Sequence, residues 1–345
     1  MKFDYAIGNP PYNADFSISG DNGKFAAPVY NLFMDAAYGI ADRVELIHPA
    51  RFLFNAGSTP KAWNEKMLNN KHFKVCYYEP DCKKVFSNTD IKGGVAITYY
   101  DRTREYAPIQ VFTPYEELNG ILQKTRKYSE KSNVGDVGIS SYAYHFTPIM
   151  HREHPEVKAF QSKGHENDLK SNIIAKLPMI FFKEKPDNKD YITIMGRLDN
   201  ERVSMFIQRS YINVVKNLDS YKIFLPKASG VGEFGEALAP AIIAMPGVGH
   251  TETFFSIGNF STLQEAENLL KYLKSRFARA LLSILKKTQM ITPSNFKFIP
   301  LQDFTPNSDI NWSASIRDID QQLYKKYGLS QQEIDFIESH VKEMA

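Results

Sequence analysis

Apolar and polar positions in the first hundred residues follow the pattern of an α/β sheet. Four short apolar runs predict β-strands: 3–7, 43–48, 72–79 and 93–101. Two segments carry apolar residues at helical spacing: 29–41 and 63–68. The order strand, helix, strand, helix, strand, strand predicts an α/β fold, half of a doubly wound sheet that ends in a hairpin. The polar, glycine-bearing residues 13–26 predict a surface loop.

Near residue 104 the pattern loosens, and a second domain is predicted beyond it. Residues 105–150 predict a linker that leads into this domain. Five short apolar runs then predict strands: 179–183, 191–196, 221–228, 241–247 and 251–258. We therefore expect a partial Rossmann-like sheet over residues 1–104 and a mixed α+β domain with C-terminal helices over residues 151–345.

The clearest helical pattern runs over residues 262–287. Thr262 and Glu265 fit a capping box, and one apolar stripe follows them. Basic residues cover the remaining faces, which favours a solvated helix surface over a DNA contact. The tail predicts a helical pair over 316–327 and 330–341, separated at Gly328.

Composition allows a nucleic-acid partner without requiring one. The formal net charge is +3, and aromatic residues make up 13% of the chain. Two cysteines do not make a disulfide scaffold, so a reducing compartment is the simpler interpretation. No signal peptide or apolar run of membrane-spanning length is recognisable, and we expect a cytoplasmic protein with no membrane partner.

The first predicted strand ends on Asn9-Pro10-Pro11-Tyr12. In α/β sheets of this kind, ligands bind beyond the carboxyl ends of the strands. Two prolines fix the backbone, so the Asn9 side-chain oxygen and the Pro10 carbonyl can accept two hydrogen bonds in set directions. An exocyclic amine is the donor that would suit them, and Tyr12 offers a stacking face for a planar ring. The alternative is a strand-ending turn in which Asn and Tyr are incidental.

Several stretches along the chain resemble one family. They are FDYAIGNPPYN, VYNLFMDAA followed by ELIHPARFLF, KVFSNTDIKGGVAITYYDR, YKIFLPKASG, GHTETFFSIGNF and IRDIDQQLYKKYGLSQQEIDFIE. Together they resemble the adenine-N6 DNA methyltransferases of restriction–modification systems. More narrowly, they resemble the fused restriction–modification methylases, whose C-terminal half carries target recognition.

This resemblance implies roles for individual residues. Asn9 and the Pro10 carbonyl would bind the amine of the target adenine, and Pro11 would hold the backbone of the motif. Tyr12 would stack on one face of the base and Phe86 on the other, after the base is flipped out of double-stranded DNA. Phe33 would line the side of the site that faces the cofactor, S-adenosylmethionine.

The resemblance also implies a missing part. In this family the S-adenosylmethionine-binding strands precede the Asn-Pro-Pro-Tyr motif, and here only residues 1–8 do. We therefore expect that a separate polypeptide supplies the cofactor-binding half, or that the chain is a truncated remnant. The strand at residues 3–7 would otherwise be an exposed apolar sheet edge.

Other patterns give weaker signals. Residues 230–235 spell G-x-G-x-x-G after a strand, but Pro240 would interrupt the helix that should follow, so a loop is favoured. Asp81, Asp90 and Lys92 resemble the metal site of a restriction nuclease, at a short spacing. Two histidine and cysteine groups lack the spacing of a four-ligand site, so we predict no metal: His72 with Cys76 and Cys82, and His151 with His154.

Basic residues of the second domain are candidates for DNA contact. Lys222 and Lys227 are the pair we select, and Arg197 and Arg202 lie in similar positions. The sequence therefore predicts an adenine-N6 methyltransferase component that binds double-stranded DNA. A DNA-recognition protein without catalysis is the alternative, and a restriction endonuclease component is a weaker one.

Overall fold

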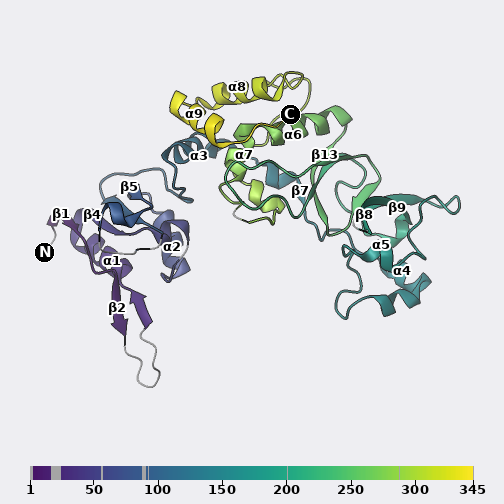
Figure 1. Cartoon of the computed structure of the whole chain (residues 1–345), viewed down its shortest axis with the longest axis horizontal. Coiled ribbons are helices and arrows are strands. Elements are labelled where there is room, and N and C mark those ends of the chain that lie inside the picture. The colour runs from purple at the N-terminus through teal and green to yellow at the C-terminus, as the bar shows by residue number, and fades with distance from the viewer. Residues whose placement is uncertain are drawn as a thin grey trace. The chain divides into compact units, whose positions relative to one another are not determined.

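The computed structural model describes residues 3–16, 25–55, 57–87, 91, 93–199, 201–286 and 288–344 (Figure 1). The chain divides into two compact units, Met1–Asn119 (unit 1) and Gly120–Ala345 (unit 2). The division falls within helix α3 (Glu116–Ser129), which lies inside the predicted linker 105–150.

Unit 1 is built on a mixed four-stranded sheet of order β1-β4-β6-β5. The strands are β1 (Phe3–Gly8), β4 (Ala41–Pro49), β5 (Phe73–Glu79) and β6 (Val95–Asp101). β1 and β4 are parallel and the other neighbours are antiparallel. Helix α1 (Tyr30–Ile40) connects β1 to β4, and α2 (Lys61–Leu68) lies between β4 and β5. The predicted order of elements and the mixed α/β class are confirmed.

The core of unit 1 is aromatic. Tyr30 from α1, Phe52 after β4 and Trp63 from α2 contact one another with ring centroids 5.1–6.4 Å apart. Phe73 and Met34 are fully buried in the same cluster. These residues come from the apolar faces of both helices and from the sheet, which explains why α1 and α2 pack onto it.

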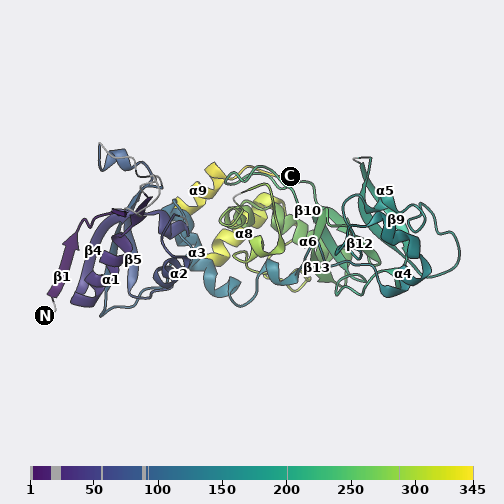
Figure 2. The same cartoon turned by 90° about the horizontal axis from the view of Figure 1, so that it is seen from below.

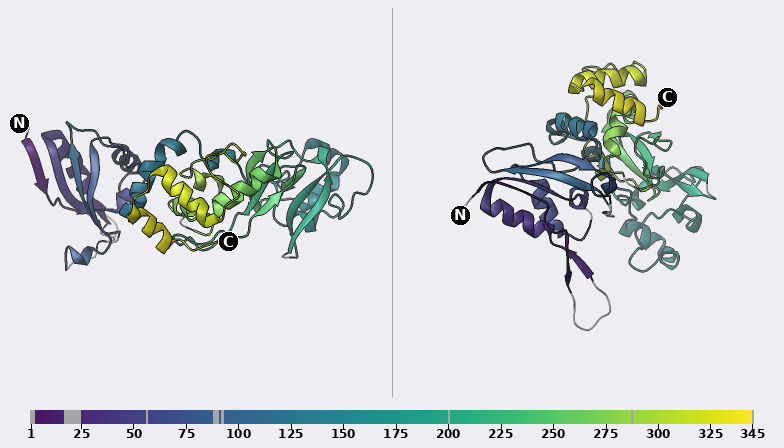
Figure 3. Two further views of the ribbon diagram at one scale, coloured as in Figure 1. Left: turned by 90° about the horizontal axis from the view of Figure 1, so that it is seen from above. Right: turned by 60° about the vertical axis from the view of Figure 1, so that its left-hand side comes forward.

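The expectation of a surface loop over residues 13–26 is wrong in part. β2 (Asn13–Phe16) pairs antiparallel with β3 (Phe25–Pro28), and the hairpin projects from unit 1 (Figure 3). Each strand has only four residues, and β2 contains Asn and Asp, which are depleted in strands. The pattern was therefore too short and too polar to show pairing. Residues 17–24 lie outside the described part of the chain.

Unit 2 contains two further sheets. One has the order β11-β10-β13-β7 and consists of β7 (Gly138–Ile139), β10 (Tyr221–Pro226), β11 (Ile242–Ala244) and β13 (Phe254–Phe260). The other has the order β12-β8-β9 and consists of β8 (Tyr191–Leu198), β9 (Glu201–Gln208) and β12 (Val248–His250). Two short helices, α4 (Pro148–Glu153) and α5 (Ile173–Lys176), pack with this second sheet (Figure 1).

The predicted strand at residues 179–183 is not one of the named strands. Phe182 makes an isolated antiparallel bridge to Phe206 of β9. Ile180 and Phe181 are buried in the core beside β8 and β9. A short apolar run can fill a core from a turn as well as from a strand, so apolarity alone did not distinguish the two.

The predicted long helix over 262–287 is broken at Ser275. The structure has α6 (Leu263–Lys274) and α7 (Arg276–Leu282), with the Ser275 side chain accepting a hydrogen bond from Ala278 N. The buried Asp320 carboxylate accepts from the backbone N–H groups of Arg276 and Phe277, at 3.0 and 2.9 Å. These acceptors satisfy N–H groups that a continuous helix would have bonded internally. The capping box of Thr262 and Glu265 is confirmed.

The predicted helical pair at the end of the chain is confirmed. α8 (Ile316–Tyr327) ends at Gly328, which has a φ of 63°, and α9 (Gln331–His340) begins with a capping box at Ser330. α8 lies beside α6 and α7, and α9 lies beside α7 (Figure 1). Within the described residues, none of the helices combines the length and apolarity needed to cross a membrane.

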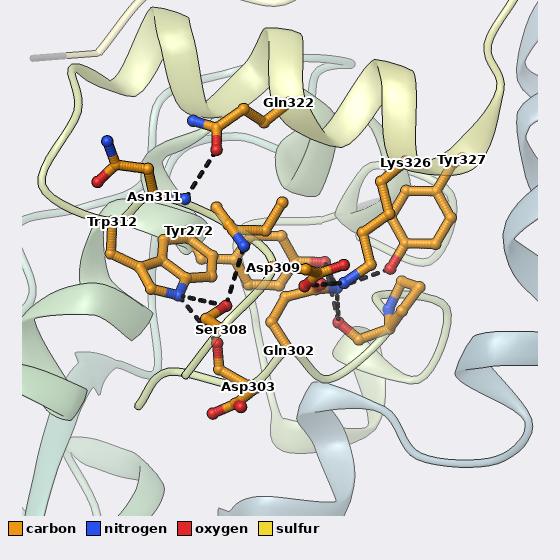
Figure 4. Close-up of polar contacts among 12 residues, drawn as sticks. Tyr272, Gln302, Asp303, Ser308, Asp309, Asn311, Trp312, Gln322, Lys326 and Tyr327 are labelled. Atoms are coloured by element: carbon orange, nitrogen blue, oxygen red, sulfur yellow. Dashed lines mark hydrogen bonds and ion pairs between the residues drawn. The ribbon is translucent and has the colours of Figure 1, made fainter. Parts of the chain in front are cut away.

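A polar network fixes the segment before α8 to the helices of unit 2 (Figure 4). The Gln302 amide nitrogen donates to the hydroxyls of Tyr272 and Tyr327, and its oxygen accepts from Lys326 at 2.9 Å. Trp312 Nε1 donates to the Asp303 carbonyl at 2.8 Å. Buried polar groups satisfied in this way favour one arrangement of the segment.

Buried titratable groups give the two units different responses to acid. Burial lowers the pKa of His48 in unit 1 and of His250 in unit 2 to about 4. Both pKa values lie near 6.5 in the unfolded chain, so stability falls as pH drops from 6.5 towards 4, by about 3 kcal/mol for each group. In unit 2 burial also raises the pKa of Asp320 to about 6. That group stabilises the folded unit as pH falls through 6, which offsets the effect of His250.

We therefore expect acid to destabilise unit 1 more than unit 2. The two tryptophans report separately, since Trp63 is buried in unit 1 and Trp312 in unit 2. Urea unfolding would be followed by fluorescence at neutral pH and near pH 4.5, in a Trp63→Phe variant and a Trp312→Phe variant. Equal loss of unfolding free energy in the two units would contradict the prediction.

Candidate active site

The register of the first sheet places the Asn-Pro-Pro-Tyr motif at a defined edge. β1 ends with Gly8 level with Leu46, and β4 continues to Pro49. Pro49 and Glu79, the last residues of β4 and β5, both pair with Val95 at the start of β6. The motif after β1, the segment after β4 and the loop between β5 and β6 therefore leave the sheet on the same side, at the carboxyl ends of β1, β4 and β5. Phe86 belongs to that loop.

Within the motif, the polar and aromatic groups differ in exposure. Asn9 and Pro11 are exposed, and Pro10 and Tyr12 are half-buried. Tyr12 packs against the core of unit 1, and its carbonyl accepts a hydrogen bond from Val29 N at 3.0 Å. That bond joins the motif to the start of α1. The motif is thus anchored through Tyr12, while the Asn9 amide stays open to solvent.

The Tyr12 hydroxyl is a buried polar group without a hydrogen-bond partner among the described residues. Burial raises the pKa of Tyr12. The nearby Asn9 side chain partly opposes this rise, although the two side chains do not meet the geometry of a hydrogen bond. A buried unpaired hydroxyl costs free energy in this state. The Asn9–Tyr12 pair therefore has hydrogen-bonding capacity that the described residues leave unused.

The loop that carries Phe86 is held by specific contacts. Asp81 accepts from Lys83 N at 3.2 Å, and the buried Cys82 sulfur accepts from Ile91 N at 3.0 Å. Gly94 has a φ of 78°, and a Cβ there would lie 2.3 Å from the Glu79 carbonyl, so only glycine fits. Phe86 itself is half-buried. Sequence reasoning did not assign these loop-holding roles to Cys82 and Gly94.

Phe33 lies on the exposed side of α1, one turn after Val29, whose N–H donates to the Tyr12 carbonyl.

Apolar side chains of β1 are also exposed: Phe3 is 49%, Tyr5 58% and Ile7 78% accessible. Within the described chain, β4 is the one strand to which β1 is hydrogen-bonded, so β1 forms the edge of the sheet (Figure 2). Parallel strand pairs are normally covered on both faces, which makes this exposure unusual.

The other predicted sites are placed as follows. Asp90 and Lys92 of the nuclease pattern lie outside the described residues, and Asp81 caps a short 3₁₀ turn. Among described side chains, no group of three or more histidine, cysteine, aspartate or glutamate residues could hold a metal ion.

The glycine-rich loop at residues 230–235 binds the chain's own carboxylate. The N–H groups of Val231 and Gly232 donate to Glu236 at 2.8 and 3.1 Å, and the buried Lys286 ammonium pairs with the same carboxylate. In a loop that binds a cofactor, backbone N–H groups of this kind donate to a phosphate or carboxylate of the ligand. Here the Glu236 carboxylate takes that position. This arrangement agrees with the loop interpretation.

The expectation that Lys222 contacts DNA does not hold. Lys222 is fully buried, and its ammonium donates to the carbonyls of Leu218, Ser220 and Met245. Burial lowers its pKa to about 8. Three acceptors satisfy its three donors, so none is left for a phosphate. Lys227 is half-buried, and its ammonium lies 4.3 Å from the Tyr142 ring centroid.

Comparisons with known proteins match part of the chain. Residues 1–86 match the family described as Eco57I restriction-modification methylase. An uncharacterized adenine-specific methylase from Mycoplasma pneumoniae is 32% identical over 96 residues, which is 28% of this chain and 22% of that protein. The crystal structure of the type IIG restriction endonuclease BpuSI aligns with 92% of this chain and 50% of that chain, at 11% identity and a TM-score of 0.29. This chain thus spans about a fifth of the length of the curated relative, and the family match over residues 1–86 includes the Asn-Pro-Pro-Tyr motif.

Proposed function

We propose, from the match of residues 1–86 to a restriction–modification methylase family, that this chain is a component of a site-specific adenine-N6 DNA methyltransferase. The observation that carries the proposal is the sheet register, which brings Asn9–Tyr12 and the Phe86 loop together at the carboxyl ends of β1 and β5. In this proposal residues 1–104 are the catalytic part and residues 151–345 recognise the DNA target, with Lys227 as a contact.

The chemistry proposed for the motif follows from its hydrogen-bond acceptors. The Asn9 side-chain oxygen and the Pro10 carbonyl would accept from the two N–H groups of an adenine amine. As that nitrogen gains a methyl group it becomes more tetrahedral and more positive, and acceptors already in place stabilise the developing charge. Tyr12 and Phe86 would stack on the two faces of a flipped base. S-adenosylmethionine would supply the methyl group.

The described residues provide only part of a site for that cofactor. Phe33 and the exposed face of β1 offer apolar surface. The glycine-rich loop of unit 2 does not fit, because Glu236 already accepts from two of its N–H groups. We therefore propose that a further polypeptide segment pairs with the open edge of β1 and carries the remaining cofactor contacts. A segment of this kind would cover Phe3, Tyr5 and Ile7.

The test is a transfer assay. The chain, purified together with the polypeptide segment that pairs with β1, would be incubated with plasmid DNA and S-adenosylmethionine labelled in the methyl group, and the DNA would be digested to nucleosides. Label in N6-methyladenine is the expected result. Label in another nucleoside would refute the adenine assignment.

A second candidate function is DNA recognition without catalysis. The incomplete cofactor site among the described residues favours it. Calorimetric titration with S-adenosylmethionine, on the chain together with the further polypeptide segment, separates the two, since a functional cofactor site would give a Kd in the micromolar range, or about −8 kcal/mol. A folded complex that binds DNA but neither binds S-adenosylmethionine nor transfers its methyl group would support the second candidate.

A further inference from the structure

Unit 2 contains a pocket that none of the roles above uses. Its volume is about 540 Å³, and it is lined by Pro148, His151, Arg152, Lys158, Glu166 and Asn167 (the cationic pocket). Three of these residues, Pro148, His151 and Arg152, belong to α4, which lies in the same part of unit 2 as β9 and α5 (Figure 2). A volume of this size admits a charged group together with its neighbouring atoms.

The walls of the cationic pocket are fixed to the core. Met150 of α4 and Val157, in the turn that follows, are fully buried. Thr147 caps α4 and donates its hydroxyl to the Ser210 carbonyl at 2.6 Å. The backbone that carries Arg152 and Lys158 is therefore held in place without any ligand, which lowers the entropic cost of binding.

Acidic groups near the pocket already have partners. Glu153 accepts from the Tyr211 hydroxyl at 2.7 Å, Glu156 pairs with His154, and Asp168 pairs with His165. Glu166, the acid that lines the pocket, accepts from Gly164 N at 2.9 Å.

Arg152 and Lys158, by contrast, have no ion pair with any described residue. Glu166 is the acid that lines the pocket with these two exposed cations, so their charges together leave the pocket net positive, which attracts an anion.

His151 adds an unused polar atom. Its Nε2 donates to Asn167 Oδ1 at 2.7 Å, and its Nδ1 is buried without a partner among the described residues. The bond to Asn167 therefore holds the His151 ring in place in the wall of the cationic pocket.

We propose that the cationic pocket binds a phosphodiester of the DNA backbone, an inference that rests on the proposed function. Arg152 and Lys158 would contact the phosphate oxygens, and the adjoining sugar would occupy the rest of the volume. Phosphate contacts of this kind set the position of a protein on DNA and carry no sequence information themselves.

The test is binding of fluorescent duplex DNA, measured by anisotropy over a range of KCl concentrations. The variant is Arg152→Gln/Lys158→Gln, in which both side chains are exposed and folding should be unaffected. We expect Kd to rise about tenfold at fixed salt, and the salt dependence to weaken by about 2 in the slope of log K against log [KCl].

The matched control is Arg317→Gln/Lys325→Gln, which removes the same two charges from exposed positions of α8. An equal effect of the two double variants would overturn the inference and leave the proposed function intact, since it would reflect net charge alone. Displacement of DNA by millimolar inorganic phosphate at constant ionic strength would identify a free-phosphate site and also overturn it. Failure of the unsubstituted chain to bind DNA would instead count against the proposed function.

Discussion

Replacing Asn9 with Ala is expected to lower kcat for the proposed methyl transfer by a factor of about 10² to 10³, which is typical when one preorganised acceptor or donor is removed from a reacting centre. Asn9 is exposed at the sheet edge, while Tyr12 anchors the motif through its ring and its carbonyl. Loss of the amide should therefore leave the fold in place. The affinities for S-adenosylmethionine and for DNA should change little, because the acceptor matters most as charge develops on the adenine nitrogen.

The control for this variant is Asn13→Ala, a neighbouring exposed asparagine outside the motif. It should keep close to full activity. Tyr12→Phe is a second comparison, since it retains the stacking ring and removes a hydroxyl that lacks a partner among the described residues. It should keep most of the activity and should not destabilise unit 1. An Asn9→Ala enzyme that retained full kcat would show that the motif is a structural turn.

Replacing Arg279 with Met should destabilise unit 2 by about 3 to 5 kcal/mol. Arg279 is 1% exposed, and its guanidinium donates to the carbonyls of Lys274, Gly235, Glu236 and Lys342. Those carbonyls come from the end of α6, the glycine-rich loop and the C-terminal segment. A methionine fills similar volume but leaves buried acceptors unpaired, and each costs about 1 to 3 kcal/mol.

The measurement is urea unfolding followed by Trp312 fluorescence in a Trp63→Phe background. Arg317→Met is the matched control, because Arg317 is exposed on α8 and its replacement should cost less than about 0.5 kcal/mol. Arg279→Lys should fall between the two, since an ammonium cannot reach all four carbonyls. Equal stability of the Arg279→Met and Arg317→Met variants would refute the assigned role.

The sequence predicted the elements whose signals are local. The order of strands and helices in unit 1, the capping boxes at Thr262 and Ser330, and the stop at Gly328 each depend on residues close together in the chain. The position of the Asn-Pro-Pro-Tyr motif after β1 was predicted on the same basis. Local propensity and capping decide such features, and both can be recognised without tertiary information.

Features set by distant residues could not be predicted. The break at Ser275 depends on Asp320, and the apolar stripe of residues 262–287 contains no sign of it. Lys222 was expected to contact phosphates because it is a basic residue in a predicted strand of the second domain. Four consecutive residues of β10 are in fact buried, so both faces of that strand are covered. A polar residue in such a strand need not face solvent.

The dependence of the Ser275 break on Asp320 has a consequence for synthesis on the ribosome. Residues 262–287 emerge before residue 320 does, and until then the N–H groups of Arg276 and Phe277 have no carboxylate to bind. Without that carboxylate, we expect these N–H groups to bond to carbonyls of the preceding helical turn, so that one helix continues through Ser275. We therefore expect the nascent segment to be a straight rod that bends only when the next 33 residues, from 288 to 320, have been made, so that the last part of the chain shapes an element completed before it.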